Sequence, residues 1–245
     1  MNQPLTLNCD MGEGFGPWKM GNDEGIMPLI DAANIACGGH AGDPSTMRQC
    51  VALARKHDTE IGAHVSYPDK EGFGRRAMDI CGQALVDLIH YQVGALDGIA
   101  RAHGRRVTYI KPHGALYNDM MINGHLRSAV MASVADSACS SLMLQATAHQ
   151  ETHRQEADMF GIQLIFEVFA DRAYQDCGAL VPRNQPGAIL DKEKMLAQVS
   201  QLSHQGSLTT ISGNPLKLDA DSLCVHGDNP QAVSEISQIR AMLKA

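Results

Sequence analysis

Short apolar runs that end in glycine-rich or polar turns recur along this chain, and these turns carry Asp, Glu or His. The first three turns are at residues 8–13 (NCDMGE), 37–43 (CGGHAGD) and 62–69 (GAHVSYPD). Three more follow at residues 111–114 (KPHG), 171–172 (DR) and 226–228 (HGD). Side chains of these types transfer protons or bind metals, and parallel barrels place their active sites at the ends of their strands. Six strand ends of this kind on one chain predict an enzyme.

Strand-like and helix-like segments alternate over the length of the chain. The hydrophobic pattern predicts strands at residues 5–9, 33–37, 61–65, 107–111, 142–145, 163–169 and 223–226, with a doubtful eighth at 208–211. Helical spacing and capping signals predict helices at residues 23–30, from 44 onward, and at 85–101, 125–138, 149–159 and 191–204, with Asn229 and Pro230 capping a last helix. This alternation implies a parallel sheet with right-handed crossover connections.

Two arrangements satisfy the alternation, a closed (β/α) barrel of TIM-like type and an open doubly wound sheet. Reactive side chains follow nearly every predicted strand instead of gathering at one switch point, which favours the barrel. No linker, composition shift or internal repeat divides the 245 residues. We therefore expect one α/β barrel domain over residues 1–245, with a core that buries roughly three quarters of the surface of the unfolded chain.

Composition and charge argue against several classes of protein. The formal net charge of −7 disfavours nucleic acid or an anionic membrane as the main partner, and no apolar stretch approaches the ~20 residues that span a bilayer. Seven cysteines without a C-x-x-C pair argue against a disulfide framework or a structural zinc site, so we expect a reducing, cytoplasmic setting. The sequence also lacks the dinucleotide fingerprint and the P-loop, which are the common nucleotide-binding motifs.

Carboxylates and histidines after the strands are the main candidates for catalysis. Asp10 and Glu13 flank the first turn, where two neighbouring carboxylates can take separate acid and base roles. Four histidines follow strand-like runs and would converge on one cavity in a barrel: His40, His64, His113 and His226. The other seven lie in helical or polar surroundings, where a structural or solvated role is expected. Asp10, His40 and His64 could hold a divalent metal, although no H-E-x-x-H motif accompanies them.

Cationic side chains near these turns are candidates for holding an anionic group of a substrate. They are Lys111 at a strand end and, in glycine-rich or strand-end contexts, Arg75, Arg76, Arg172 and Arg183. A cation in such a place can bind a carboxylate or a phosphate. Segment 66–76 is long enough to form a lid, with a plain surface loop as the other interpretation. Asp43 and Asp228 stand before prolines that begin helices, so helix capping competes with a role at the site.

The position of Lys111 follows from the alternation of side chains along a strand. Val107, Tyr109 and Lys111 share one face of their predicted strand. If that face lines the barrel, the ammonium group points into the cavity, where burial without an anionic partner is costly. Asp10 or Glu13 could be that partner in the free protein.

Longer motifs carry a resemblance that covers essentially the whole chain. They lie at residues 7–13, 33–43, 61–64, 72–76, 91–96, 111–117, 167–172, 180–183 and 225–228. In content and order these motifs resemble the LamB/YcsF family, which comprises the A subunits of 5-oxoprolinase and the lactam utilisation proteins. The chain departs from the family pattern at Gly39, at Val65 and over residues 142–147.

The resemblance implies a distorted barrel, usually of seven strands, related to the barrels of glycoside hydrolases and polysaccharide deacetylases. It also implies an enzyme that works with subunits B and C to open the lactam of 5-oxo-L-proline to L-glutamate, with ATP hydrolysed by the complex. For that reaction the expected catalytic residues are Asp10, Glu13, His40, His64 and His113. The residues expected to hold the substrate or a phosphate are Lys111, Arg75, Asp171, Arg172, His226 and Asp228.

Two other functions fit the same residues. A stand-alone metal-dependent deacetylase or amidase, acting on a carbohydrate or a lactam, would need a bound divalent ion and no ATP. A non-catalytic subunit that binds the lactam for its partners would keep the cations but tolerate the loss of Asp10. An activity assay with partner subunits, 5-oxoproline and ATP, with and without a chelator, distinguishes the three functions.

Overall fold

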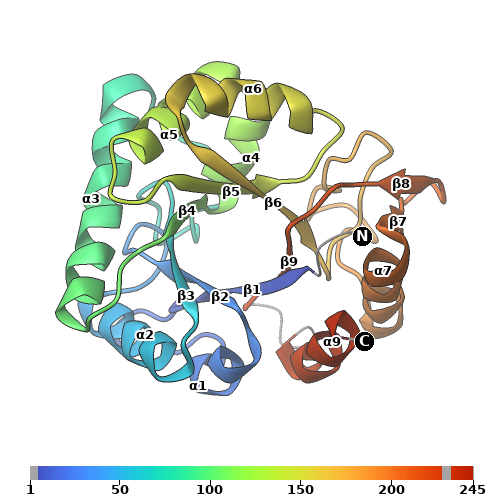
Figure 1. Cartoon of the computed structure of the whole chain (residues 1–245), viewed down its shortest axis with the longest axis horizontal. Helices are drawn as coiled ribbons and strands as arrows, with labels where there is room; N and C mark the ends of the chain where they lie inside the picture. Colours follow the sequence, from blue (N-terminus) through green and yellow to red (C-terminus); the bar gives the residue numbers. More distant parts are fainter. Residues whose placement is uncertain (1–4, 228–232, 245) are drawn as a thin grey trace.

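The computed structural model describes residues 5–227 and 233–244, and its centre is a closed barrel of parallel strands (Figure 1). The barrel strands are β1 (Thr6–Met11), β2 (Ala32–Ala36), β3 (Glu60–Val65), β4 (Tyr109–Pro112), β5 (Ser141–Gln145), β6 (Gln163–Phe169) and β9 (Ser222–Val225). The helices are α1 (Asp23–Ile26), η1 (Met27–Leu29), α2 (Pro44–His57), α3 (Gly82–Ala102), α4 (Gly114–Ile122), α5 (Gly124–Ala135), α6 (Gln150–Phe160), α7 (Lys192–Gln205) and α9 (Ile236–Leu243). This order confirms the predicted TIM-like α/β barrel with seven strands.

Strands β6 and β9 pair with each other and close the barrel, although a long segment of the chain separates them in sequence. Glu167 of β6 is in register with Ser222 of β9, and β9 pairs in turn with β1. Between β6 and β9 run α7 and a separate antiparallel pair, β7 (Ser207–Thr209) and β8 (Pro215–Lys217). The doubtful eighth strand expected at 208–211 therefore falls in this pair and not in the barrel.

The helices agree with the sequence pattern in most places and differ from it in two. Helix α4 was not marked by any periodicity, because its apolar residues lie on all sides. The helix expected at 23–30 divides into α1 and the 3-10 turn η1, which contains Pro28, a residue that cannot donate a helical hydrogen bond. The predicted cap at Asn229 and Pro230 lies outside the described residues. Among the helices that are described, none has the length and apolar character to cross a membrane.

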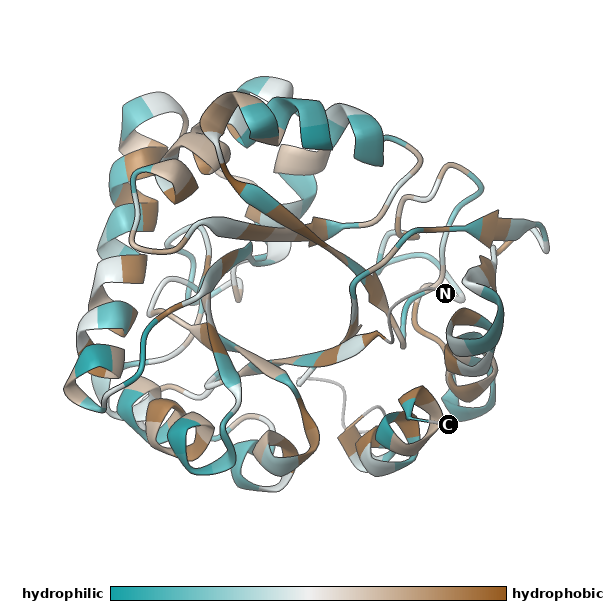
Figure 2. Ribbon diagram, in the orientation of Figure 1, coloured by the Kyte–Doolittle hydropathy of each residue, from teal (hydrophilic) through white to brown (hydrophobic). Residues whose placement is uncertain are grey.

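Strand β1 separates an apolar layer from a polar barrel lumen. Leu7, Cys9 and Met11 join the main hydrophobic core between the barrel and its helices, whereas Asn8 and Asp10 alternate to the other face and bond to Asn34 of the neighbouring strand β2. Figure 2 shows hydrophobic residues along the barrel strands and a mixture of hydrophobic and hydrophilic residues along the surrounding helices, as expected for helices with one buried face.

A network of buried hydrogen bonds occupies part of the lumen. Asn8 donates to the Ser222 hydroxyl (2.8 Å), and Asn34 donates to both Asn8 and Asp10 (2.8 Å each). The Tyr109 hydroxyl donates to Oδ1 of Asn34 (2.6 Å). These side chains are all buried, where satisfied polar groups hold one another in a fixed orientation. The network therefore supports Asp10 from inside the barrel.

The lumen network predicts a steric limit at Gly62 of β3. A Cβ atom there would overlap the Tyr109 ring, so Gly62→Ala should displace this ring and weaken its bond to Asn34. We expect the free energy of unfolding, measured with urea, to fall by about 1–3 kcal/mol. Gly98→Ala on the exposed side of α3 is the control, because a Cβ there meets nothing within 4 Å. It should raise stability by about 0.5–1 kcal/mol, and equal effects of the two substitutions would contradict this packing.

Candidate functional site

Four buried side chains converge at the carboxyl ends of the first four strands. Glu13 follows β1, His40 lies in the loop after β2, His64 is in β3 and His113 follows β4. One potential ligand atom from each lies within 4.8 Å of those of the other three. Residues far apart in the sequence therefore form one cluster of oxygen and nitrogen donors, hereafter the donor cluster, which is compatible with a divalent metal ion.

The imidazole rings of the donor cluster pack tightly on one another. His40 and His113 are stacked with ring centroids 3.7 Å apart, and His64 meets both edge-on. The ring of Phe73, from segment 66–76, packs edge-on against His40 and His113. Burial, and then the neighbouring imidazoles, hold the pKa of His113 and of His40 well below the usual range, so both rings are neutral.

Backbone carbonyl groups decide which nitrogen of two rings carries the proton. Nδ1 of His64 lies 3.0 Å from the carbonyl oxygen of Lys111, and Nε2 of His113 lies 2.9 Å from that of Phe73. A carbonyl oxygen only accepts hydrogen bonds, so we assign an N–H to each of these two nitrogens. The opposite nitrogens, Nε2 of His64 and Nδ1 of His113, lie 2.9 Å apart and face the centre of the cluster.

Asp10 lies at the edge of the donor cluster as an ionised carboxylate. Its Oδ1 accepts hydrogen bonds from Asn34 (2.8 Å) and from Nζ of Lys111 (3.0 Å), while its Oδ2 lies 3.5 Å from Nε2 of His64. Burial by itself raises the pKa of Asp10, but the charges of His64 and Lys111 outweigh it and bring the pKa well below the usual range. The carboxylate therefore keeps its charge inside the barrel.

Lys111 is buried within the barrel on the strand face that the alternation predicts. Only 2% of the residue is exposed, and Nζ lies 3.0 Å from both Oδ1 of Asp10 and Oε2 of Glu167. Burial lowers the pKa of Lys111, yet Asp10, Cys224 and Glu167 raise it to well above its usual value. The Tyr117 hydroxyl holds the other oxygen of Glu167 at 2.9 Å. The ammonium group is thus engaged by the protein's own carboxylates.

Comparison with known proteins identifies the family. A model of the LamB/YcsF family matches residues 5–245. The chain belongs to the LamB/YcsF family. It is 52% identical to a protein of Pseudomonas fluorescens (strain Pf0-1) that is named as the A subunit of 5-oxoprolinase, over 98% of this chain and 96% of that protein. It is 49% identical to a protein of the same name from Vibrio campbellii, over 99% of this chain and 96% of the relative.

A solved structure of the same kind has the same fold. The crystal structure of the lactam utilization protein from Thermus thermophilus superposes with a TM-score of 0.89, at 32% identity, and covers 99% of this chain and 96% of that one. A cellobiose-phosphate cleavage protein from Enterococcus faecalis, described as putative, superposes with a TM-score of 0.55 at 11% identity, over 99% of this chain and 91% of that one. That likeness concerns the barrel fold alone.

In this LamB/YcsF chain, a second group of the predicted site residues follows β6 and β9. Asp171 accepts a hydrogen bond from Nδ1 of His226 at 2.8 Å, and the His226 ring stacks on Phe169 with centroids 5.1 Å apart. Arg172 is buried and donates to the carbonyl oxygens of Val181 (2.7 Å) and Ala188 (3.3 Å). Burial, and then the charge of Arg183, lower the pKa of Arg172 to about 10. Arg172 therefore holds the loop that contains Val181 and Ala188.

Segment 66–76 is anchored to the donor cluster. The Gly74 carbonyl accepts a hydrogen bond from the backbone of Ala115 (2.8 Å), and Asp69 accepts one from the backbone of Gly72 (2.9 Å) and pairs with Arg76. Phe73 has a φ of 53°, an uncommon conformation for a residue with a side chain, and its carbonyl contacts His113. The segment is therefore part of the wall of the site, and Arg75 from it is exposed near the Phe73 ring.

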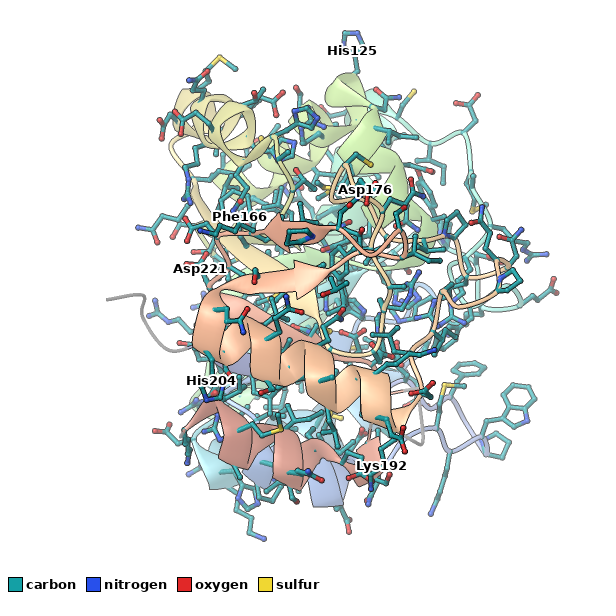
Figure 3. The ribbon with its side chains drawn as sticks, turned by 90° about the vertical axis from the view of Figure 1, so that its right-hand side faces the viewer. His125, Phe166, Asp176, Lys192, His204 and Asp221 are labelled. Carbon is teal, nitrogen blue, oxygen red and sulfur yellow. The ribbon has the colours of Figure 1, made fainter. Side chains whose placement is uncertain are left out.

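One further predicted residue, Asp43, has a simpler explanation than a role at the site. Asp43 caps α2 by accepting a hydrogen bond from the backbone of Thr46 (2.8 Å), as the capping interpretation expects. Asp228 lies outside the described residues. Of the histidines set aside as structural or solvated, His125 projects outward from the molecule and His204 lies on the outer side of α7 (Figure 3).

Sequence reasoning missed the residues that support Asp10 and Lys111 from within the lumen. These residues are Asn8, Asn34, Tyr117 and Glu167. Glu167 offered a signal, because it is a single acidic residue inside the apolar strand at 163–169. A charge in the middle of such a strand is costly to bury and therefore indicates a buried partner of opposite charge.

The buried ion pairs predict a large effect of replacing Lys111. Lys111→Met leaves Asp10 and Glu167 buried without their shared cation, so we expect the free energy of unfolding at pH 7 to fall by about 3–5 kcal/mol. Lys192→Met is the control, because its ion pair with Glu235 is half exposed and should contribute less than about 1 kcal/mol. Adding Glu167→Gln to Lys111→Met should restore part of the loss. Similar losses in the two lysine variants would contradict the assigned pairing.

Proposed function

We propose that this chain is the A subunit of an ATP-dependent 5-oxoprolinase, which opens the lactam ring of 5-oxo-L-proline to give L-glutamate. Two relatives that carry this name align with it over nearly their whole length, which supports the substrate. The observation that carries the chemistry is the buried, ionised carboxylate of Asp10 beside the donor cluster. The chain is accordingly a hydrolase that acts on a cyclic amide.

Asp10 is the proposed base. A five-membered lactam is an unreactive amide, and phosphorylation of its oxygen by ATP would make the ring carbon strongly electrophilic. Attack on such a carbon needs only a weak base, and the ionised Oδ2 of Asp10 can accept the proton of the attacking water. Lys111 acts through Asp10, because it holds the opposite oxygen of the carboxylate and keeps it charged. The donor cluster orients the reacting groups next to this carboxylate.

His226 is the proposed acid for the departing ring nitrogen, whose loss leaves an acyl phosphate that a second water hydrolyses to glutamate and phosphate. Asp171 accepts the Nδ1 proton, so the protonated ring can donate its second proton from Nε2. The charge of His226 also contributes to the low pKa of Asp10, which supports a common cavity for the two groups. Arg75 is exposed on the segment that walls the donor cluster, and we assign it to the substrate carboxylate or to a phosphate.

The proposal includes partner subunits. The curated relatives are named as one lettered subunit of 5-oxoprolinase, which supports an assembly, and we propose subunits B and C as the other components. The chain lacks both common nucleotide-binding motifs, so ATP is proposed to enter the reaction through the complex.

The donor cluster favours a second function, a metal-dependent amidase that needs no ATP. Its histidine and carboxylate set is of the kind that catalytic metal sites use. The requirement for ATP separates the two functions, because only the 5-oxoprolinase couples ring opening to ATP hydrolysis.

The first functional prediction concerns the isolated chain. We expect the purified chain to form no measurable glutamate from 5-oxoproline with ATP, and the mixture with subunits B and C to form glutamate and ADP together. The measurement is a coupled glutamate assay in which the components are omitted one at a time. Robust ring opening by the chain alone, without ATP, would favour the amidase instead.

The second functional prediction concerns Asp10. Asp10→Asn keeps the size of the side chain but removes its charge, so turnover by the complex should fall by at least roughly 100-fold. Glu167 remains as a counterion of Lys111, and the variant should still fold and assemble. His90→Ala on α3 is the control and should stay within about threefold of the unchanged protein. Full turnover by Asp10→Asn would point to the non-catalytic binding function.

A further inference from the structure

We infer that the donor cluster of Glu13, His40, His64 and His113 is a resident site for one divalent transition-metal ion of the zinc type. The inference concerns metal binding by this chain itself. It rests on the geometry of the described side chains and is independent of the lactam reaction.

Ring nitrogens of two histidines face one another in the donor cluster. The carbonyls of Lys111 and Phe73 hold the protons of His64 and His113 on the outer nitrogens. When neither ring carries a second proton, the two inner nitrogens, 2.9 Å apart, both present electron pairs, and Oδ2 of the Asp10 carboxylate lies 3.5 Å from the same nitrogen of His64. Three electron-rich atoms at these distances repel one another unless a cation lies among them.

A metal ion satisfies more of the donor cluster than a proton does. A proton added to His64 would bridge to His113 or to Asp10. It would leave Oε1 of Glu13, which lies 3.3 Å from Nε2 of His40 and 3.7 Å from Nδ1 of His113, outside the bridge. A metal ion accepts electron pairs from all four side chains at once.

The spacing of the ligand atoms suits a small ion. Zinc bonds of about 2.0–2.1 Å to nitrogen and oxygen place neighbouring ligands of a tetrahedron roughly 3.3 Å apart. The separations quoted above, 2.9, 3.3 and 3.7 Å, bracket that value, and every pair lies within 4.8 Å. Sub-ångström to ångström shifts of the side chains therefore suffice to bring the ligands together.

The surroundings of the rings resemble those of metal ligands in general. Metal-binding histidines usually donate their second N–H to a carbonyl or a carboxylate, which fixes the ring, and His64 and His113 both do so here. Three imidazoles with one carboxylate suit zinc and its transition-metal neighbours, whereas Mg²⁺ and Ca²⁺ prefer oxygen ligands throughout. The site is therefore expected to discriminate against those two ions.

Metal binding is tested on the full chain, without partner subunits. The protein is purified, stripped with a chelator, and titrated with Zn²⁺ in a calorimeter, and elemental analysis then counts the retained ions. We expect one Zn²⁺ per chain and a rise in melting temperature on addition of Zn²⁺, with no such rise for Mg²⁺ at the same concentration. A chain that retains no stoichiometric zinc and shows no thermal shift would overturn the inference.

Substitutions of the proposed ligands test where the ion binds. His64→Gln and Glu13→Gln should each weaken Zn²⁺ binding at least roughly 100-fold. His153→Gln, at an equally buried histidine on α6, should bind Zn²⁺ as the unchanged protein does. The visible spectrum of Co²⁺ in place of Zn²⁺ provides a second readout, because its bands should change in the first two variants only. Unchanged binding in both ligand variants would overturn the inference, and a negative result would leave the lactam proposal standing.

Discussion

The ammonium group of Lys111 organises the interior of this barrel. Its contacts of 3.0 Å to Asp10 and to Glu167 tie β1, β4 and β6 together across the lumen. A carboxylate buried alone would take up a proton, but beside His64 and this cation Asp10 stays ionised. The same residue also orients a ring, because its backbone carbonyl accepts the Nδ1 proton of His64. One strand position therefore sets the charge of a carboxylate and the tautomer of an imidazole.

Stability and chemistry are divided between the two faces of the strands. Outward side chains such as Leu7 and Met11 pack under the helices, where apolar burial stabilises the fold. Inward side chains such as Asn8 and Asn34 satisfy one another by hydrogen bonds and hold Asp10 in place. Polar groups in a low-dielectric interior are costly unless every partner is present, so the lumen network has little freedom to rearrange. The donor cluster is built on this rigid base.

The sequence predicts the barrel and the positions of the strand ends, but not the contacts between distant strands. Apolar runs that stop at polar turns marked the first four strand ends, and a parallel barrel brings such ends together. Alternation along one strand also predicted that Lys111 shares a face with Tyr109, and that face lines the lumen. The pairing with Glu167 depends on how β6 and β9 close the barrel across a long excursion, which no local pattern encodes. Likewise, Arg172 has the sequence context of an anion ligand, yet its partners are carbonyls of a loop fixed by long-range pairing.

Two glycines in the wall of the site leave no room for a side chain. A Cβ atom at Gly74 would lie 2.8 Å from Cβ of His40 and 2.9 Å from Cδ2 of His113, and one at Gly114 would overlap the Gly74 carbonyl. The backbone of the wall therefore packs directly against the two rings at this point. A single methyl group at either glycine would push the Phe73 carbonyl away from His113 and release the ring to turn its N–H inward. The absence of side chains at Gly74 and Gly114 thus sets the orientation of the His113 ring, and with it the direction of its unshared electron pair.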